Sequence, residues 1–175
     1  EPGLFSLQHR GEEAAGICTA DGHDLHLYKN RGLVGEVFTE EKLSGLKGRH
    51  AIGHTRYSTT GSSTVVNAQP YRVDYSRGQI AIAHNGNLVN AERLRAELEA
   101  NGSIFGSTMD SEIFIHLMAR PQYRNVEEAI TSVMREVEGA YCLVILTGGC
   151  LIAARDPHGF RPLSLGKLGT SWVVA

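Results

Sequence analysis

The sequence of 175 residues is 42% hydrophobic and 21% charged, with a formal net charge of −2. This length suits one domain, and the composition is that of an ordinary globular protein. The charge balance lacks the basic excess that is typical of nucleic-acid-binding proteins. No stretch approaches the ~18 consecutive apolar residues of a membrane span, and no signal peptide is visible. We therefore expect a cytoplasmic protein that has neither nucleic acid nor a membrane among its partners.

The three cysteines, Cys18, Cys142 and Cys150, are odd in number and show no paired spacing. This pattern argues against a disulfide framework and against a zinc site. Cys18 and Cys142 stand in apolar runs, so we interpret them as buried structural thiols. His50 and His54 are four residues apart, but the segment between them has the pattern of a strand, so we expect no metal site.

The first half of the chain is expected to consist mainly of strands. Asp21-Gly22 is a strong hairpin signal between two strand-like runs. In chain order we expect strands at 14–20 and 25–29, a short helix at 34–46, a strand at 51–57, a loop at 61–70 and a buried strand at 79–84.

The second half is expected to contain three helices and then strands. Asn90 is the expected N-cap of the first helix, and Gly102 follows its end. The helices are predicted at 91–101, 111–120 and 126–137, followed by strands at 140–147, 150–155, 163–168 and 171–174. Strands, then helices, then strands again favour an α+β fold with antiparallel sheets.

Two polar runs, 54–61 and 84–87, each follow an apolar strand, where a scaffold commonly presents functional groups. Arg56 in the first run offers a planar fork of donors that suits a carboxylate, although it could equally form a structural ion pair. Asn85-Gly86 in the second run is compatible with a tight turn. Its amide side chain and backbone N–H could instead form an oxyanion hole.

Asp110 stands at the start of an apolar helix, where it could cap the helix or receive an ammonium group. In the second case, Arg56 and Asp110 would hold the two charged ends of an amino acid. Arg10 and Gly11, near the beginning of the sequence, could either fix a loop or line a pocket.

Six runs, taken in this order, resemble the glutaminase domain of the amidophosphoribosyltransferase family. Tyr57 favours this family over the similar glucosamine-phosphate synthases, which carry tryptophan there. The resemblance covers 1–175 as one type 2 (class II) glutamine amidotransferase domain. It implies the four-layer αββα fold of N-terminal-nucleophile hydrolases, with two antiparallel sheets between helical layers. The matching runs are 7–11, 53–61, 84–90, 110–112, 138–141 and 156–162.

The resemblance implies hydrolysis of glutamine to glutamate and ammonia. The ammonia would be transferred to phosphoribosyl pyrophosphate, giving phosphoribosylamine in the first step of de novo purine synthesis. The matching positions imply that Arg56 binds the α-carboxylate of glutamine and that Asp110 binds its α-ammonium group. They also imply that Asn85 and Gly86 form the oxyanion hole. By the same match, Thr59 lies near the substrate, and Arg10 and Gly11 border the nucleophile.

The sequence departs from the family pattern at its beginning. The family's nucleophile is a cysteine at the mature N-terminus, whose own α-amine moves the proton. This sequence begins Glu1-Pro2-Gly3. We therefore expect the first strand with the nucleophile, and also the phosphoribosyltransferase domain, to lie outside these residues, and we expect the 175 residues alone to be inactive.

Two alternatives stay open at this stage. The chain could belong to another class II amidotransferase, such as a glucosamine-phosphate synthase, or it could be a non-catalytic glutamine-binding module. The resemblance implies glutamine, a downstream phosphoribosyltransferase domain and further copies of the protein as partners. It implies no cofactor in this domain, Mg²⁺ in the downstream domain, and in some members an iron–sulfur cluster with ligands beyond Ala175.

Overall fold

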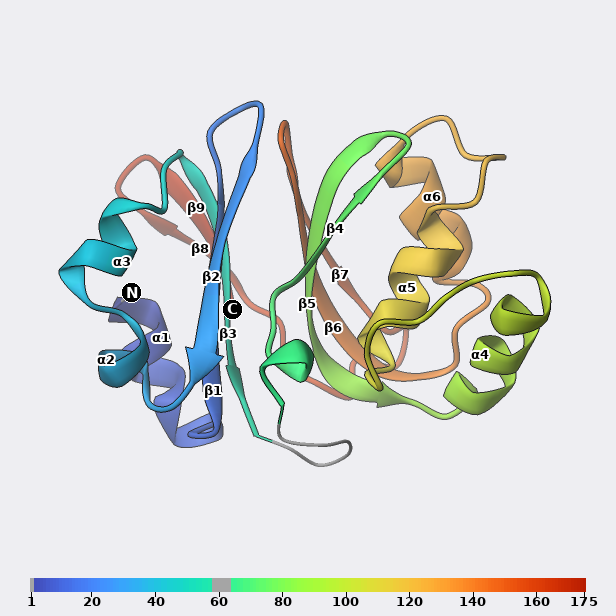
Figure 1. The fold of residues 1–175 in the computed structure, drawn as a ribbon, viewed down its shortest axis with the longest axis horizontal. Coiled ribbons are helices and arrows are strands. Elements are labelled where there is room, and N and C mark those ends of the chain that lie inside the picture. Colours follow the sequence, from blue (N-terminus) through green and yellow to red (C-terminus); the bar gives the residue numbers. More distant parts are fainter. Residues whose placement is uncertain (1, 58–63) are drawn as a thin grey trace.

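The computed structural model describes residues 2–57 and 64–175. Two antiparallel sheets face each other, and helices cover the outer face of each sheet (Figure 1). The first sheet has the strand order β2-β1-β3, and the second has the order β4-β5-β6-β7. These strands are β1 (Ala14–Ala20), β2 (Leu25–Arg31), β3 (His50–Arg56), β4 (Tyr71–Tyr75), β5 (Gly78–Leu88), β6 (Gly139–Thr147) and β7 (Leu151–Arg155).

The helices form the two outer layers. One group lies against the first sheet and the other against the second, which gives the order helix, sheet, sheet, helix (Figure 1). This arrangement confirms the predicted α+β, αββα fold. The first group is α1 (Pro2–Leu7), α2 (Val34–Val37) and α3 (Glu40–Ser44), and the second is α4 (Ala91–Ala100), α5 (Ser111–Met118) and α6 (Val126–Val133).

Three apolar clusters hold the layers together. The largest joins the second sheet to α4, α5 and α6, with Ile82 and Phe114 fully buried at its centre. Another joins the first sheet to α1 and α2 through Ile17 and Val34. The third fills the space between the two sheets and consists of Cys18, Ala20, Leu25, Ile52, Ala81, Ala83 and Leu146.

The alternation of side chains along β5 explains how these clusters separate. Successive residues of a strand point to opposite faces of its sheet. Ile80 and Ile82 pack toward the helices, while Ala81 and Ala83 face the first sheet. Large side chains thus fill the outer faces, where each contributes about 1.5–3 kcal/mol on burial. The small side chains between the sheets allow a close approach, so residues on the two facing surfaces can contribute to one site.

The hairpin predicted at Asp21-Gly22 is confirmed. The Asp21 carboxylate accepts hydrogen bonds from the backbone N–H groups of His23 and Asp24, at 3.0 and 2.9 Å. Gly22 has a φ of 104°, which a residue with a side chain rarely adopts. The hairpin places β1 and β2 in register along their whole length, with Ala20 opposite Leu25.

Two of the predicted elements differ in kind from those observed, and the helix predicted at 126–137 ends at Val133. The single helix expected at 34–46 is two short helices, because Phe38 and Thr39 have extended backbone and Thr39 caps α3 by accepting from the Lys42 N–H. The loop expected at 61–70 contains, among its described residues, the short 3-10 helix η2 (Val65–Asn67). Three further elements were not predicted, namely α1, the 3-10 helix η1 (Gln8–Arg10) and β4.

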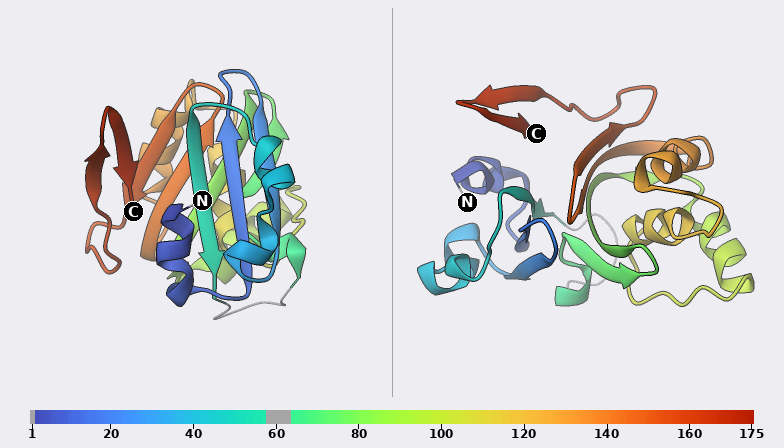
Figure 2. Two further views of the ribbon diagram at one scale, coloured as in Figure 1. Left: turned by 90° about the vertical axis from the view of Figure 1, so that its left-hand side faces the viewer. Right: turned by 90° about the horizontal axis from the view of Figure 1, so that it is seen from above.

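The C-terminal hairpin is confirmed, with strands β8 (Leu165–Leu168) and β9 (Ser171–Val174). It forms a separate two-stranded sheet, and it stands apart from both larger sheets in Figure 2. Its large apolar side chains, including Leu168 and Trp172, are mostly exposed. None of the helices in the described part of the chain combines the length and apolar character needed to cross a membrane.

Candidate functional site

Arg56 is the last residue of β3, and it lies on the surface that faces the second sheet. Ile52 belongs to the cluster between the sheets, and Arg56 follows it by four residues, so both are on the same face of the strand. The Arg56 residue is only 6% exposed. Its guanidinium lies 4.0 Å from the Glu13 carboxylate, at the limit of an ion pair. The structural ion pair considered from the sequence is therefore present at this limiting distance.

Gly11 supports the backbone of Arg56. Gly11 is buried, and a Cβ atom at this position would lie 2.6 Å from the Arg56 carbonyl carbon and 2.8 Å from the Arg56 nitrogen. The Glu13 N–H donates to the Arg56 carbonyl oxygen at 3.1 Å. The structure therefore brings Gly11 and Arg56 together, because only glycine permits this close approach. Arg10 is exposed, at the end of the 3-10 helix η1 (Gln8–Arg10), and Thr59 lies outside the described residues.

Asn85 and Gly86 lie within β5, so the prediction that residues 84–87 follow the end of a strand was wrong. The strand continues to Leu88 because β6 pairs with it throughout, with Asn85 opposite Cys142 and Gly86 opposite Tyr141. Asn85 lies two residues beyond Ala83 and therefore on the face turned to the first sheet. The Asn85 residue is exposed.

Gly86 occupies a position that no other residue fits. Its φ is 153°, and a Cβ atom there would lie 2.0 Å from the Ala140 carbonyl oxygen and 2.8 Å from Nε2 of His84. The first distance is far below van der Waals contact. A side chain at position 86 would therefore push β5 away from β6, so the glycine keeps the ladder intact beside Asn85.

Asp110 is the residue immediately before α5, but its side chain makes no capping hydrogen bond to that helix. Its carboxylate instead accepts from the Leu88 N–H at 3.0 Å and lies 3.4 Å from Nδ1 of the buried His84. Burial acts to raise the pKa of Asp110, but these groups outweigh it and hold the pKa below its usual range. Asp110 therefore carries a negative charge at neutral pH.

The segment that follows the undescribed residues connects the parts of the site. Gln69 exchanges two hydrogen bonds with the backbone of His84. Asn67 exchanges two with Thr108, two residues before Asp110. These buried amides were not recognised from the sequence, because each finds its partner far along the chain. The prediction that the Asn90 side chain caps α4 was wrong. This side chain forms hydrogen bonds with the backbone of Glu136 and Glu138, which are also distant in the sequence.

Cys18 and Cys142 are buried thiols, as the sequence predicted. Cys18 is fully buried, and burial raises its pKa to about 11. Cys142 is 8% exposed, burial raises its pKa, and its thiol lies 3.4 Å from the Pro162 carbonyl oxygen. A reactive thiol needs a lowered pKa.

Among residues 2–57 and 64–175, no cluster of three or more His, Cys, Asp or Glu side chains is placed to hold a metal ion.

Residues 54–175 match the family model of the glutamine amidotransferase domain. The chain belongs to this family. The curated relatives include the amidophosphoribosyltransferase of Methanocaldococcus jannaschii, which is 52% identical over 94% of this chain and 36% of its own length. The enzyme of the same name from Bacillus subtilis is 45% identical over 99% of this chain and 37% of its own. The chain thus spans little more than a third of these relatives.

Solved structures agree with this assignment. The glutamine phosphoribosylpyrophosphate amidotransferase of Bacillus subtilis, complexed with ADP and GMP, superposes with a TM-score of 0.92 at 44% identity. The match covers 98% of this chain and 37% of the solved chain. A structure described as the allosteric regulatory enzyme of purine biosynthesis gives 0.94 at 45% identity, with the same coverage. The resemblance inferred from six short runs of sequence is therefore confirmed.

Proposed function

We propose that this chain is the glutamine-hydrolysing domain of an amidophosphoribosyltransferase. The observation that carries the proposal is the end-to-end similarity, at 44–52% identity, to proteins of that name. The domain would release ammonia for transfer to phosphoribosyl pyrophosphate on a further domain of the same protein, which would form phosphoribosylamine. Mg²⁺ would act on that further domain, and an iron–sulfur cluster, where one exists, would also lie there.

Arg56 and Asp110 would hold the two charged groups of glutamine. A guanidinium can donate two parallel hydrogen bonds to the α-carboxylate, and burial strengthens such a pair. Asp110 is ionised and half-buried, which suits it to the α-ammonium group.

Asn85 and Gly86 would stabilise the reaction intermediate. Attack of a thiolate on the side-chain amide carbon of glutamine turns the amide oxygen into an oxyanion. The Asn85 amide and the Gly86 N–H are the two donors for that oxygen, and one such donor typically contributes about 3 kcal/mol. Collapse of the intermediate expels ammonia and leaves a thioester, which water then hydrolyses to glutamate. Thr59, Arg10 and Gly11 would border this site.

The nucleophile would be the cysteine at the mature N-terminus that the family resemblance implies. Cys18 is unsuited because it is fully buried with a raised pKa, and Cys142 because its buried thiol already contacts backbone carbonyl oxygens. The complete protein would act in the cytoplasm as a homo-oligomer, although relatives from plants are described as chloroplastic.

The test compares two nitrogen sources in the full-length protein. Arg56→Gln should raise the glutamine KM strongly, by about 30-fold, because a buried charged partner is lost. Activity with ammonia should persist, because ammonia bypasses this domain. Arg93→Gln, which removes an exposed ion pair with Glu97 on α4, is the matched control and should leave both activities unchanged. Unchanged glutamine kinetics in the Arg56 variant would refute its assigned role.

The acceptor distinguishes this proposal from the related synthase. The full-length protein should form phosphoribosylamine from phosphoribosyl pyrophosphate and should leave fructose 6-phosphate unchanged. Amination of fructose 6-phosphate would instead identify a glucosamine-phosphate synthase. Binding of glutamine without hydrolysis by the full-length protein would identify a non-catalytic module.

A further inference from the structure

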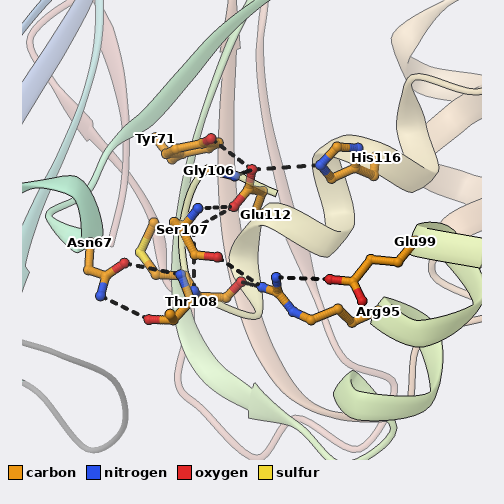
Figure 3. A network of polar contacts seen from close by, with 10 residues as sticks. Asn67, Tyr71, Arg95, Glu99, Gly106, Ser107, Thr108, Glu112 and His116 are labelled. Carbon is orange, nitrogen blue, oxygen red and sulfur yellow. Dashed lines mark hydrogen bonds and ion pairs between the residues drawn. The ribbon is translucent and has the colours of Figure 1, made fainter. Parts of the chain in front are cut away.

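The loop between α4 and α5 ends at Asp110, and a buried carboxylate holds this loop from the α5 side. Glu112 is 3% exposed. One of its oxygens accepts from the Gly106 N–H at 2.8 Å, and the other accepts from the Ser107 N–H at 2.8 Å (Figure 3). The Tyr71 hydroxyl donates to the first oxygen at 2.8 Å, and the Ser107 hydroxyl donates to the second at 2.6 Å. Both oxygens are therefore fully engaged.

A guanidinium holds the same loop from the α4 side. Arg95 donates to the carbonyl oxygens of Ser107 and Met109, at 3.2 and 3.1 Å. Its guanidinium also stacks on the Phe105 ring, 3.8 Å from the centroid. The loop thus has its N–H groups bound by an anion and its carbonyl groups bound by a cation, which is a pairing of strong, charge-assisted hydrogen bonds.

The loop is also hydrogen-bonded to Asn67, the last residue of η2. The Asn67 amide donates to the Thr108 hydroxyl at 3.0 Å, and the Thr108 N–H donates to the Asn67 carbonyl oxygen at 3.3 Å. Side chains from three separate elements therefore fix residues 106–109 (Figure 3). Asp110 is the next residue along the chain.

The charge of Glu112 is maintained in this environment. Burial alone would raise its pKa, but His116, Ser107, the Gly106 N–H and Tyr71 outweigh burial and lower the pKa to about 2. The carboxylate is therefore ionised at any pH at which the protein would work, and it acts only as an acceptor.

We propose that Glu112 and Arg95 are positioning residues of the glutamine site, which act by setting the place of Asp110. This inference rests on the proposed function, in which Asp110 binds the α-ammonium group of glutamine. Neither residue touches the substrate. Their contribution is to selectivity for an α-amino acid, because they fix the backbone from which the ammonium-binding carboxylate projects.

Glutaramate, which is glutamine without its α-ammonium group, separates this role from a general structural one. It retains the carboxylate for Arg56 and the amide that reacts, but it has nothing for Asp110 to bind. The measured quantity is the ratio of kcat/KM for glutamine to kcat/KM for glutaramate in the full-length protein. A change that merely loosens the fold lowers both values and leaves their ratio unchanged.

Glu112→Gln is the principal variant. It keeps the size of the side chain but places an amide NH₂ against a backbone N–H of Gly106 or Ser107. The ratio should fall roughly 10- to 100-fold, because small displacements of a binding group have effects of this size. Activity with ammonia should persist. Glu128→Gln is the control, since Glu128 also accepts a loop N–H, from Arg124, but at the start of α6.

Asp110→Asn separates failure of this inference from failure of the proposed function. If Asp110→Asn leaves the ratio unchanged, the ammonium-binding role itself is wrong. If Asp110→Asn lowers the ratio and Glu112→Gln does not, only the positioning role is overturned. The double variant should show no further fall beyond Asp110→Asn, because the two residues act through one interaction.

Arg95→Met provides a second test should Glu112→Gln fail to fold. It removes the bonds to the Ser107 and Met109 carbonyl oxygens from a half-buried position on α4. The same ratio should fall at least several-fold. A ratio equal to that of the unaltered protein in a folded Arg95→Met variant would overturn the proposal.

Discussion

Gln69 and His84 exchange two hydrogen bonds, in which the Gln69 side chain takes the place of a strand backbone. The Gln69 amide donates to the His84 carbonyl oxygen at 3.2 Å, and the His84 N–H donates to the Gln69 carbonyl oxygen at 2.6 Å. β4 pairs with β5 up to Tyr71 opposite Ile82. Two residues further along the same register, the amide of Gln69 continues the ladder to the residue before Asn85.

Replacing Gln69 by leucine should therefore destabilise the protein. Two buried backbone groups of His84 would lose their partners, and each unsatisfied group costs about 1–3 kcal/mol. Urea unfolding should show a midpoint lowered by an amount equivalent to roughly 3 kcal/mol, with the same m-value. Gln122→Leu, at an exposed position, is the control. Equal midpoints for the two variants would show that the Gln69 bonds contribute nothing.

Asn85→Ala should lower the glutamine kcat more than it changes KM. The amide would act on charge that develops only during the reaction, and removal of one such donor typically costs about 10²–10³ in kcat. Steady-state glutaminase assays of the full-length protein measure both constants. Asn30→Ala, at an exposed position near the end of β2, should leave them unchanged. An effect of Asn85→Ala confined to KM would indicate a substrate-binding role instead.

Gly86→Ala should be strongly destabilising even though it adds one methyl group. The new Cβ would lie 2.0 Å from the Ala140 carbonyl oxygen on the neighbouring strand. Strain and overpacking together should cost about 3 kcal/mol or more, measured by denaturant unfolding. Gly149→Ala, where a Cβ would have nothing within 4 Å, should lie within about 0.5 kcal/mol of the unaltered protein. Similar losses at both positions would contradict this account.

Glu112→Gln should reduce the dependence of the free energy of unfolding on pH below about pH 4.5. Despite its burial, Glu112 has a pKa lowered by its hydrogen-bond donors to about 2, from an ordinary value of 4.5. A carboxylate with a lowered pKa stabilises the fold above its unfolded pKa, and the contribution is lost as pH falls from about 4.5 toward 2. The stability difference between the unaltered protein and the variant should be largest near pH 7 and should shrink below pH 4.5. A difference independent of pH would show that the charge is immaterial.

Thiol labelling should separate the cysteines by burial. Cys18 is fully buried with a pKa raised to about 11, so a disulfide reagent at pH 8 should label it only after denaturation. Cys150 is partly exposed in the turn before β7, and it should be labelled in the native state. Peptide mass spectrometry identifies the labelled sites, with Cys150→Ser as the control. Native labelling of Cys18 would mean that the two sheets open readily.

Elements with strong local signals could be predicted from the sequence. The Asp21-Gly22 hairpin and α4, which ends before Gly102, lie within a few residues of where they were expected. Asn85-Gly86 misled the prediction because this pair is a local turn signal. Nine residues of pairing with β6, from Ile80 to Leu88, override that signal. The pairing partner lies more than fifty residues away, beyond the reach of local patterns.

The candidate site was predictable only in part. Arg56, Gly11 and Asp110 could be named from residue chemistry and family resemblance, and the structure pairs the first two directly. Gln69 and Glu112 could not be named, because a lone amide and a helical glutamate usually mark a solvated surface. Their roles depend on backbone groups that the fold brings to them.

The layer between the two sheets combines the small residues Cys18, Ala20, Ala81 and Ala83 with Leu25, Ile52 and Leu146. Arg56 extends from one of these sheets and Asn85 from the other. The thickness of that layer therefore sets the distance between Arg56, which is proposed to bind the carboxylate of the substrate, and Asn85, which is proposed to bind the oxygen of the reacting amide. A single methyl group added within the layer would increase this distance without contacting either Arg56 or Asn85.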